Sequence, residues 1–156
     1  MIHDSLDALA AALAPVGALV GLDLGERTIG VAVSDPLRSV ATPLSTIRRR
    51  KFTTDAEALE ALVADRAPVA YVLGLPLNMD GSDGPRVQST RAFARNLDRR
   101  GGPAIAFWDE RLSTVAAERA LLEADTSRKR RAEVIDAVAA GYILQGALDR
   151  LRVIGA

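Results

Sequence analysis

The sequence contains no cysteine among its 156 residues and only one histidine, His3, close to the amino terminus. Disulfide bonds and thiolate metal sites are therefore excluded, and the lack of cysteine fits a reducing cytoplasmic environment. No serine–histidine or cysteine–histidine arrangement is present, and no glycine-rich lysine motif of the kind that binds nucleotide phosphates. With no second histidine and no cysteine nearby, His3 is assigned no functional role.

Net charge is also absent, because 20 Lys and Arg residues balance 20 Asp and Glu residues. The basic residues are nevertheless clustered: residues 48–51 and 128–131 are two basic runs. Arg91, Arg95 and Arg99 recur at helical spacing and form a basic stripe. Local patches of this kind bind phosphate even when the total charge is zero. Each run alone also fits a solvent-exposed loop.

Residues 1–17 contain no Lys or Arg, so they lack the positive start of a signal peptide. Their apolar residues lie at helical spacing and predict an amphipathic helix that ends near Pro15 and Gly17. This segment is too short to span a membrane. A hydrophobic content of 49% over 156 residues is enough for a core of its own. We therefore expect a single domain over 1–156, with 1–17 as an N-terminal helical extension.

The remaining pattern predicts an α/β fold with a five-stranded mixed sheet flanked by helices. Pro43 places the third strand at an edge, and Thr54 with Glu57 forms a capping box for the first long helix. The helices between the third, fourth and fifth strands indicate right-handed parallel crossovers. The expected strands are 18–24, 29–34, 39–47, 69–75 and 104–108; the expected helices are 54–66, one from 85 to about 100, one from 113, and 132–152.

Three acids stand out against apolar surroundings. Asp23 lies in the run Gly21-Leu-Asp-Leu-Gly25, which is typical of a buried central strand. Glu110 follows the last strand, and Asp136 is the only charged residue between positions 134 and 144 of an apolar helix. A buried carboxylate is costly unless it is paired, hydrogen-bonded or bound to metal.

A single buried aspartate is more often structural than catalytic, but three acids near strand ends favour a site. Carboxylates without histidine or cysteine select hard cations, above all Mg²⁺ or Mn²⁺. Two such ions can activate a water and stabilise the leaving oxygen of a phosphodiester.

Four segments, taken together and in this order, resemble the YqgF/RuvX family of Holliday-junction-resolvase-like nucleases, whose members have an RNase H-like fold. They are Gly21-Leu-Asp-Leu-Gly-Glu-Arg-Thr-Ile-Gly-Val-Ala-Val-Ser-Asp35, Val72-Leu-Gly-Leu-Pro-Leu-Asn-Met-Asp-Gly81, Asp109-Glu-Arg-Leu-Ser-Thr114 and Ile135-Asp-Ala-Val-Ala-Ala140. The resemblance implies that Asp23, Glu110 and Asp136 are the catalytic, metal-binding acids. It also implies a bacterial cytoplasmic protein linked to 5′-end processing of pre-16S ribosomal RNA, or in some members to junction cleavage.

Five further residues are candidates for substrate binding: Arg27, Asn78, Arg91, Arg95 and Arg111. Relatives often have Gly-Thr-Lys where this chain has Gly25-Glu26-Arg27, so Arg27 keeps the positive charge while Glu26 adds a negative one. Asn78 is equally typical of an ordinary turn, and Arg111 either contacts phosphate or pairs with an acid.

Two other polar or aromatic residues receive structural interpretations. Ser113 is expected to cap a helix. Trp108 lies in an apolar strand and is expected in the core instead of serving as a stacking platform.

Several functions stay open on the sequence alone. Besides an RNA-processing nuclease, the chain fits a DNA-junction resolvase, which would need a dimer to cut symmetrically. It also fits a non-catalytic RNA-binding ribosome-assembly factor. A Gly-x-Asp-x-Gly hairpin occurs in actin-like kinases too, but those need two such domains and 156 residues are too few. The expected partner is structured nucleic acid, with no membrane, for a monomer or weak homodimer.

Overall fold

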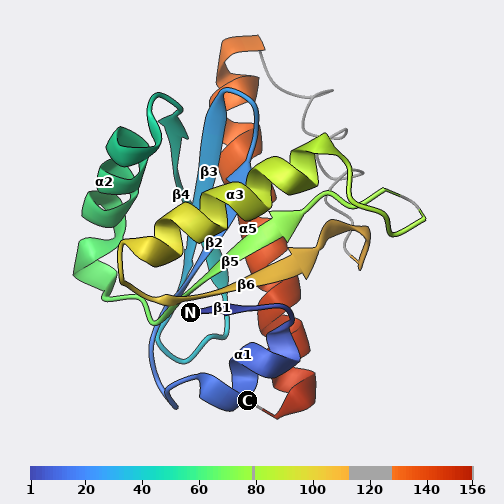
Figure 1. The fold of residues 1–156 in the computed structure, drawn as a ribbon. Coiled ribbons are helices and arrows are strands. Elements are labelled where there is room, and N and C mark those ends of the chain that lie inside the picture. Colours follow the sequence, from blue (N-terminus) through green and yellow to red (C-terminus); the bar gives the residue numbers. More distant parts are fainter. Residues whose placement is uncertain (79, 113–127, 156) are drawn as a thin grey trace.

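A computed structural model of the chain describes residues 1–78, 80–112 and 128–155, with the backbone alone over 128–134. It contains a six-stranded sheet in the order β1-β6-β5-β2-β3-β4 (Figure 1). The strands are β1 (Ile2–His3), β2 (Leu19–Leu24), β3 (Thr28–Ser34), β4 (Ala41–Arg48), β5 (Ala70–Leu75) and β6 (Ala104–Asp109). The helices are α1 (Leu6–Ala12), α2 (Phe52–Val63), η1 (Ala64–Arg66), α3 (Pro85–Arg99), η2 (Glu110–Leu112) and α5 (Arg128–Ile154).

Strand β2 lies inside the sheet between an antiparallel and a parallel neighbour. It pairs antiparallel with β3, which pairs antiparallel with β4. On its other side β2 pairs parallel with β5, and β5 pairs parallel with β6. The mixed α/β sheet and the parallel crossovers through α2 and α3 are therefore confirmed. Strand β4 lies at the sheet edge, as Pro43 predicts, and its register shifts beside that proline.

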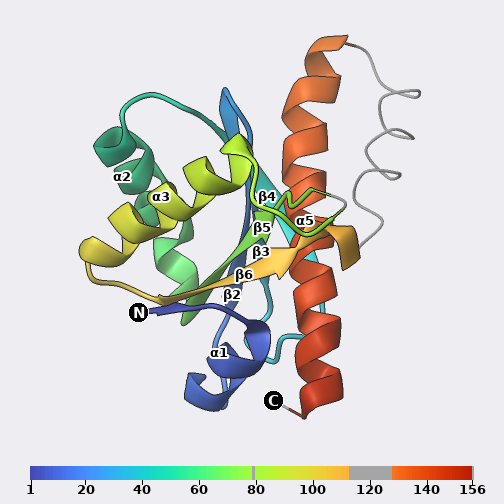
Figure 2. The same ribbon diagram turned by 45° about the vertical axis from the view of Figure 1, so that its right-hand side comes forward.

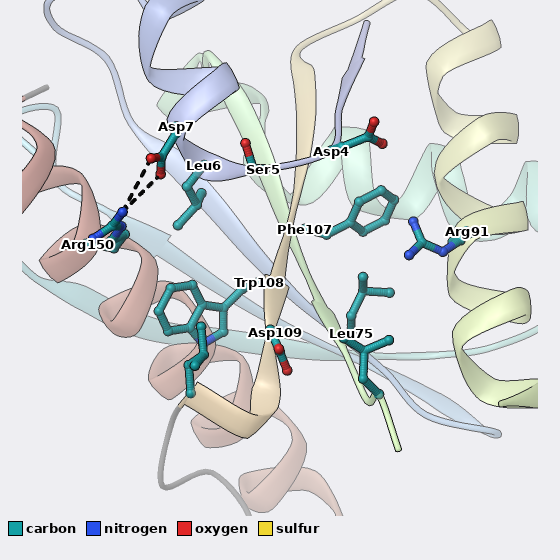
Figure 3. Close-up of a pocket in the computed structure, with 12 residues that line it drawn as sticks. Asp4, Ser5, Leu6, Asp7, Leu75, Arg91, Phe107, Trp108, Asp109 and Arg150 are labelled. Carbon is teal, nitrogen blue, oxygen red and sulfur yellow. Dashed lines mark hydrogen bonds and ion pairs between the residues drawn. The ribbon is translucent and has the colours of Figure 1, made fainter. Parts of the chain in front are cut away.

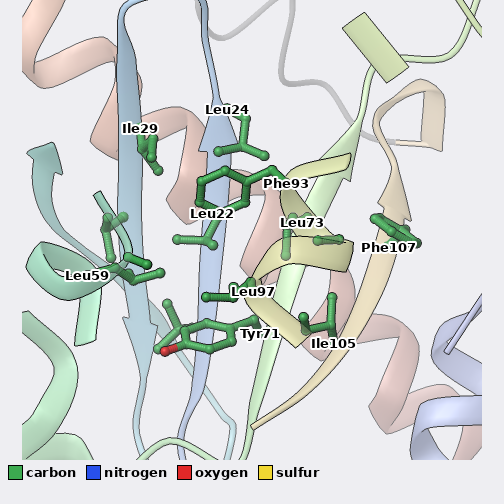
Figure 4. Close-up of a cluster of buried hydrophobic side chains, with 14 of the residues drawn as sticks. Leu22, Leu24, Ile29, Leu59, Tyr71, Leu73, Phe93, Leu97, Ile105 and Phe107 are labelled. Carbon is green, nitrogen blue, oxygen red and sulfur yellow. The ribbon is translucent and has the colours of Figure 1, made fainter. Parts of the chain in front are cut away.

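Helices cover both faces of the sheet and enclose two apolar clusters. Helices α2 and α3 lie on one face, and the long helix α5 lies across the other with α1 beside its C-terminal part (Figure 2). The α2/α3 cluster is built from side chains such as Leu22, Leu59, Leu73 and Phe93 (Figure 4). Alternate residues of the same strands, such as Leu19 and Val72, pack against α5 and α1. This strict alternation decides which strand residues face α5.

The amino-terminal segment differs from the helix expected over 1–17. Ile2 and His3 form a sixth strand, parallel to β6, so the predicted count of five strands was one too low. The helix covers only Leu6–Ala12 and begins where the Ser5 hydroxyl accepts a hydrogen bond from the Ala8 N–H. Helical spacing of the apolar residues was misleading here, because two residues of strand are too few to show alternation.

Helix α2 begins at Phe52, two residues before the predicted start, and Thr54 does not cap it. Lys51 occupies the N-cap position and makes no side-chain cap. Instead the buried Asp55 carboxylate accepts a hydrogen bond of 2.8 Å from the Arg50 N–H. An acid in the first turn thus satisfies a donor just outside the helix, and the capping box predicted at Thr54 is wrong, because the helix already begins at Phe52.

Helix α5 begins at Arg128, so the basic run 128–131 is its first turn and not a loop. The cap expected at Ser113 and the helix expected after it lie outside the described residues. No described helix is both long enough and apolar enough to cross a membrane.

Candidate active site

Asp23 lies near the end of β2 and points toward α5. Its neighbour Leu22 belongs to the α2/α3 cluster together with Leu73, its partner on β5. Because side chains alternate along a strand, Asp23 faces the opposite side. The side chain is only 4% exposed. A nearly buried carboxylate therefore stands on the α5 face of β2, and its burial within a central strand is what the sequence predicted.

Gly30 lies directly opposite Asp23 on β3 and lets α5 approach the sheet. A Cβ atom at Gly30 would collide with the backbone carbonyl of Asp136. Glycine in a strand often marks such close backbone contact. This contact brings Asp136, from a distant part of the chain, to the strand that pairs with Asp23.

The Asp136 carboxylate is oriented by Thr28, the first residue of β3. The Thr28 hydroxyl donates a hydrogen bond to Asp136 Oδ2. A hydroxyl donor of this kind fixes the direction of a carboxylate and leaves the other carboxylate oxygen for a ligand. Sequence reasoning missed Thr28, because a threonine at the start of a strand is ordinary in composition.

Gly74 has the corresponding role on the other side of Asp23. It lies on β5, next to the paired residues Leu22 and Leu73. A Cβ atom at Gly74 would lie 2.5 Å from Glu110 Oε1 and 2.6 Å from Ile143 Cδ1. Glu110, the first residue of η2 directly after β6, therefore directs its carboxylate over Gly74 on the α5 face. Asp23 stands between two glycines, each with one of the other acids over it.

The donor set fits a hard divalent cation in its chemistry, because all three side chains are carboxylates on one face of the sheet. Within residues 1–78, 80–112 and 128–155, however, no three acidic or histidine side chains are gathered tightly enough to hold one ion. The structure thus brings the three predicted acids to one region without closing a coordination shell.

Arg111 follows Glu110 and is held by Asp109. Its Nη2 lies 2.7 Å from Asp109 Oδ2, and its Nε lies 3.0 Å from Asp109 Oδ1. The bonds from Arg111 hold the pKa of the Asp109 carboxyl below its ordinary value. Of the two roles open for Arg111, the structure shows the pairing with an acid; a contact with phosphate stays a prediction.

Asn78 and Asp80 organise the loop after β5. The Asn78 side-chain amide donates to the Ser82 hydroxyl, which in turn donates to Asp80 Oδ1. The Ser82 hydrogen bonds also lower the pKa of Asp80. These contacts are those of a turn, and substrate binding by Asn78 stays a prediction. Met79 lies outside the described residues.

The predicted basic side chains have different surroundings. Arg91 pairs with Asp83 at 3.3 Å and covers the ring of Phe107. Arg27 and Arg95 are exposed, and neither side chain makes an ion pair or hydrogen bond with another described residue. Arg27 and Arg95 therefore leave their charge available to a ligand, whereas Arg91 is partly neutralised.

A pocket of about 460 Å³ lies beside the C-terminal part of β6 and is lined by residues of α1, α3 and α5 (Figure 3). Its apolar wall includes Leu75, Phe107 and Trp108, and its rim carries both acids and arginines, among them Asp4 and Arg91. Trp108 is 8% exposed, which confirms its assignment to the core.

Comparison with known proteins identifies the family of the chain. The RuvX family, described as Holliday junction resolvase, matches residues 17–150. A protein of Paracoccus denitrificans named "Putative pre-16S rRNA nuclease" is 72% identical over 155 residues, which cover 99% of this chain and 98% of the relative. A protein of Ruegeria pomeroyi with the same name is 71% identical over 152 residues, covering 97% and 99%.

A solved structure shares the fold at low identity. The yeast mitochondrial Holliday junction resolvase superposes with a TM-score of 0.50 at 12% identity, covering 96% of this chain and 85% of that one. This likeness agrees with the RNase H-like fold that the sequence predicted. The match over 17–150 and the identities near 70% establish that the chain belongs to the YqgF/RuvX family.

Proposed function

We propose that this protein is a divalent-metal-dependent nuclease that processes the 5′ end of pre-16S ribosomal RNA in the cytoplasm. The proposal rests chiefly on the placement of Asp23 between Gly30 and Gly74, with Asp136 and Glu110 over the two glycines. The name shared by the relatives at about 70% identity supports the substrate.

Asp23, Glu110 and Asp136 would hold the metal, with Mg²⁺ or Mn²⁺ as the candidates. When bound, such an ion activates water and stabilises the leaving oxygen of a phosphodiester. The protein contributes the positions of the carboxylates. Burial keeps bulk water from Asp23, and the Thr28 hydroxyl orients Asp136. No side chain is assigned as general base.

A cleavage assay with Asp23→Asn tests the proposal. The asparagine keeps the shape of the side chain and removes the charge that a cation needs, so we expect cleavage of pre-16S RNA to be lost while the protein stays folded. Circular dichroism and the melting temperature, measured with and without Mn²⁺, supply the control. If Asp23→Asn melts well below the wild type but cleaves as well per folded molecule, Asp23 is structural and not catalytic.

The family description favours a second candidate, cleavage of a four-way DNA junction. One domain carries one set of acids and makes one cut, which suits trimming of an RNA end. A junction needs two coordinated cuts and therefore a dimer. The same assay on a four-way junction, with sedimentation of the protein, separates the candidates. Paired nicks by a stable dimer would replace the RNA substrate by DNA, and binding without cleavage of either would indicate an assembly factor.

A further inference from the structure

Basic side chains gather around the turn that follows Asp23. Arg49 Nη1 donates a hydrogen bond of 2.7 Å to the carbonyl of Gly25, and the Arg49 N–H donates to the carbonyl of Arg27. Arg86, in the first turn of α3, lies 3.5 Å from the carbonyl of Leu24. Two segments far apart in the sequence thus bring guanidinium groups to the residues that directly follow Asp23.

The same region collects further positive charge. Arg27, Arg50, Lys51 and Arg86 are exposed, and Arg49 is half-buried with its guanidinium 5.8 Å from the centre of the Phe93 ring. We call these five residues the turn cluster. The acids nearest to them in the sequence are Glu26 and Asp83, which are exposed, and Asp55, which is buried; Asp83 pairs with Arg91. A chain without net charge therefore has a strongly basic region beside its candidate active site.

The fold extends this region toward the second basic run. The turn between β2 and β3, the end of β4 and the first turn of α5 all lie at one end of the molecule, the upper end in both views (Figures 1 and 2). That first turn of α5 begins at Arg128. The opposite end carries α1, whose Asp7 pairs with Arg150 of α5 at 3.3 Å.

We propose that the turn cluster is the surface that binds the phosphate backbone of the nucleic acid on one side of the cleaved bond. The proposal deepens the nuclease function above and rests on it for the identity of the ligand. Guanidinium groups suit phosphate because their donors form a planar fork. The Phe93 ring, over which the Arg49 guanidinium lies, is only 4% exposed. The surface therefore reads backbone charge and shape without stacking bases.

Arg49 has a second role within this surface, as a positioning residue. Its contacts join the turn after Asp23 to β4 and to the Phe93 ring of α3. The Arg49 guanidinium is already hydrogen-bonded to the Gly25 carbonyl, so the contacts to phosphate come from the four exposed members of the cluster.

The test compares two charge-matched triple variants in an Asp23→Asn background, which binds without cutting. The cluster variant carries Arg50→Gln, Lys51→Gln and Arg86→Gln. The control carries Arg66→Gln, Arg150→Gln and Arg152→Gln, three exposed residues outside the cluster. The probe is a fluorescent RNA hairpin with a single-stranded 5′ extension, and the measurement is the dissociation constant between 50 and 200 mM salt.

Each phosphate contact contributes about 0.7 to 0.9 to the slope of log affinity against log salt. Loss of three contacts should make the slope less steep by about 2 to 3. When salt is raised from 50 to 200 mM, the fold-loss of affinity should therefore be smaller for the cluster variant than for its Asp23→Asn parent by a factor of roughly 16 or more. The control should keep the parental slope. If the cluster variant fails to fold, Lys51→Gln alone should lower the slope by just under one unit.

Equal slopes for the cluster variant and the control would overturn the proposal. This result is distinguishable from failure of the nuclease function. If the wild-type protein cleaves while the two slopes are equal, the nuclease function stands and the turn cluster is not the phosphate-binding surface. If the wild-type protein cleaves nothing while the slopes differ, the nuclease function is refuted and the turn cluster still binds nucleic acid.

Discussion

Replacing Gly30 by alanine should disturb both the stability and the active site, because the added methyl group meets backbone and not a flexible side chain. Its Cβ would collide with the carbonyl of Asp136. Relief requires a movement of α5 away from β3. That helix packs on β2, β3, β4 and β5 together, so a local shift loosens contacts across one whole face of the sheet.

The expected size follows from what the methyl group meets. Overpacking a buried site costs about 1 to 3 kcal/mol, and a backbone contact in a four-strand interface places Gly30→Ala near 3 kcal/mol. With a urea dependence of about 2 kcal/mol per molar, the unfolding midpoint should fall by about 1.5 M. For a chain of this size the melting temperature should fall by roughly 6 to 12 °C. Cleavage should be lost even where the variant is folded, because Asp136 moves with the helix.

Gly102→Ala is the matched control. No atom lies within 4 Å of a Cβ at that exposed position, and its backbone does not require a positive φ. The substitution should be neutral or stabilise by up to about 1 kcal/mol through the unfolded chain. The reasoning is refuted if Gly30→Ala unfolds at the same urea concentration as the Gly102→Ala protein and cleaves as well as the wild type.

Three further changes probe the same site. Gly74→Ala should reduce cleavage more than stability, because its methyl group meets the movable ends of side chains, Glu110 among them; equal proportional losses would contradict this. Mg²⁺ or Mn²⁺ should raise the melting temperature of the wild type more than that of Asp136→Asn, and equal shifts would remove Asp136 from the metal site. Arg111 lowers the pKa of Asp109, so this ion pair stabilises the fold above the ordinary aspartate pKa of about 4 and is lost as the pH falls through the lower folded value. Arg111→Gln should therefore destabilise the protein at pH 7 and converge with the wild type in acid titrations of unfolding; a constant difference at all pH values would refute the role of the pair.

The sheet could be predicted from the sequence because its strands are apolar runs with clear boundaries. Strand β2, with Asp23 inside it, is recognisable from composition alone. The sixth strand could not be recognised, since Ile2–His3 is too short to show a period and owes its conformation to pairing with β6. The start of α2 was misplaced for a related reason. The buried Asp55 turns back to accept a hydrogen bond from the Arg50 N–H, just outside the helix, and the sequence does not reveal this contact.

The acids themselves were visible as charges in apolar surroundings, whereas their support was not. Thr28 orients Asp136 across 108 positions of sequence, and no local pattern marks a contact of that range. The pairing of Arg111 with Asp109 was one of two open roles, and only the fold decides which acid lies within reach.

The glycines of the two strands beside β2 connect these observations. A carboxylate in a central strand can be reached by other acids only if the neighbouring strands carry nothing on that face at the same level. Gly30 and Gly74 supply that space on either side of Asp23: the backbone of Asp136 fills it at Gly30, and the side chains of Glu110 and Ile143 fill it at Gly74. In this chain the two glycines therefore let α5 and the Glu110 side chain approach the sheet on either side of Asp23. The pattern can be recognised only once the strand pairing is fixed, because the two glycines lie 7 and 51 positions after Asp23 and no sequence period relates them.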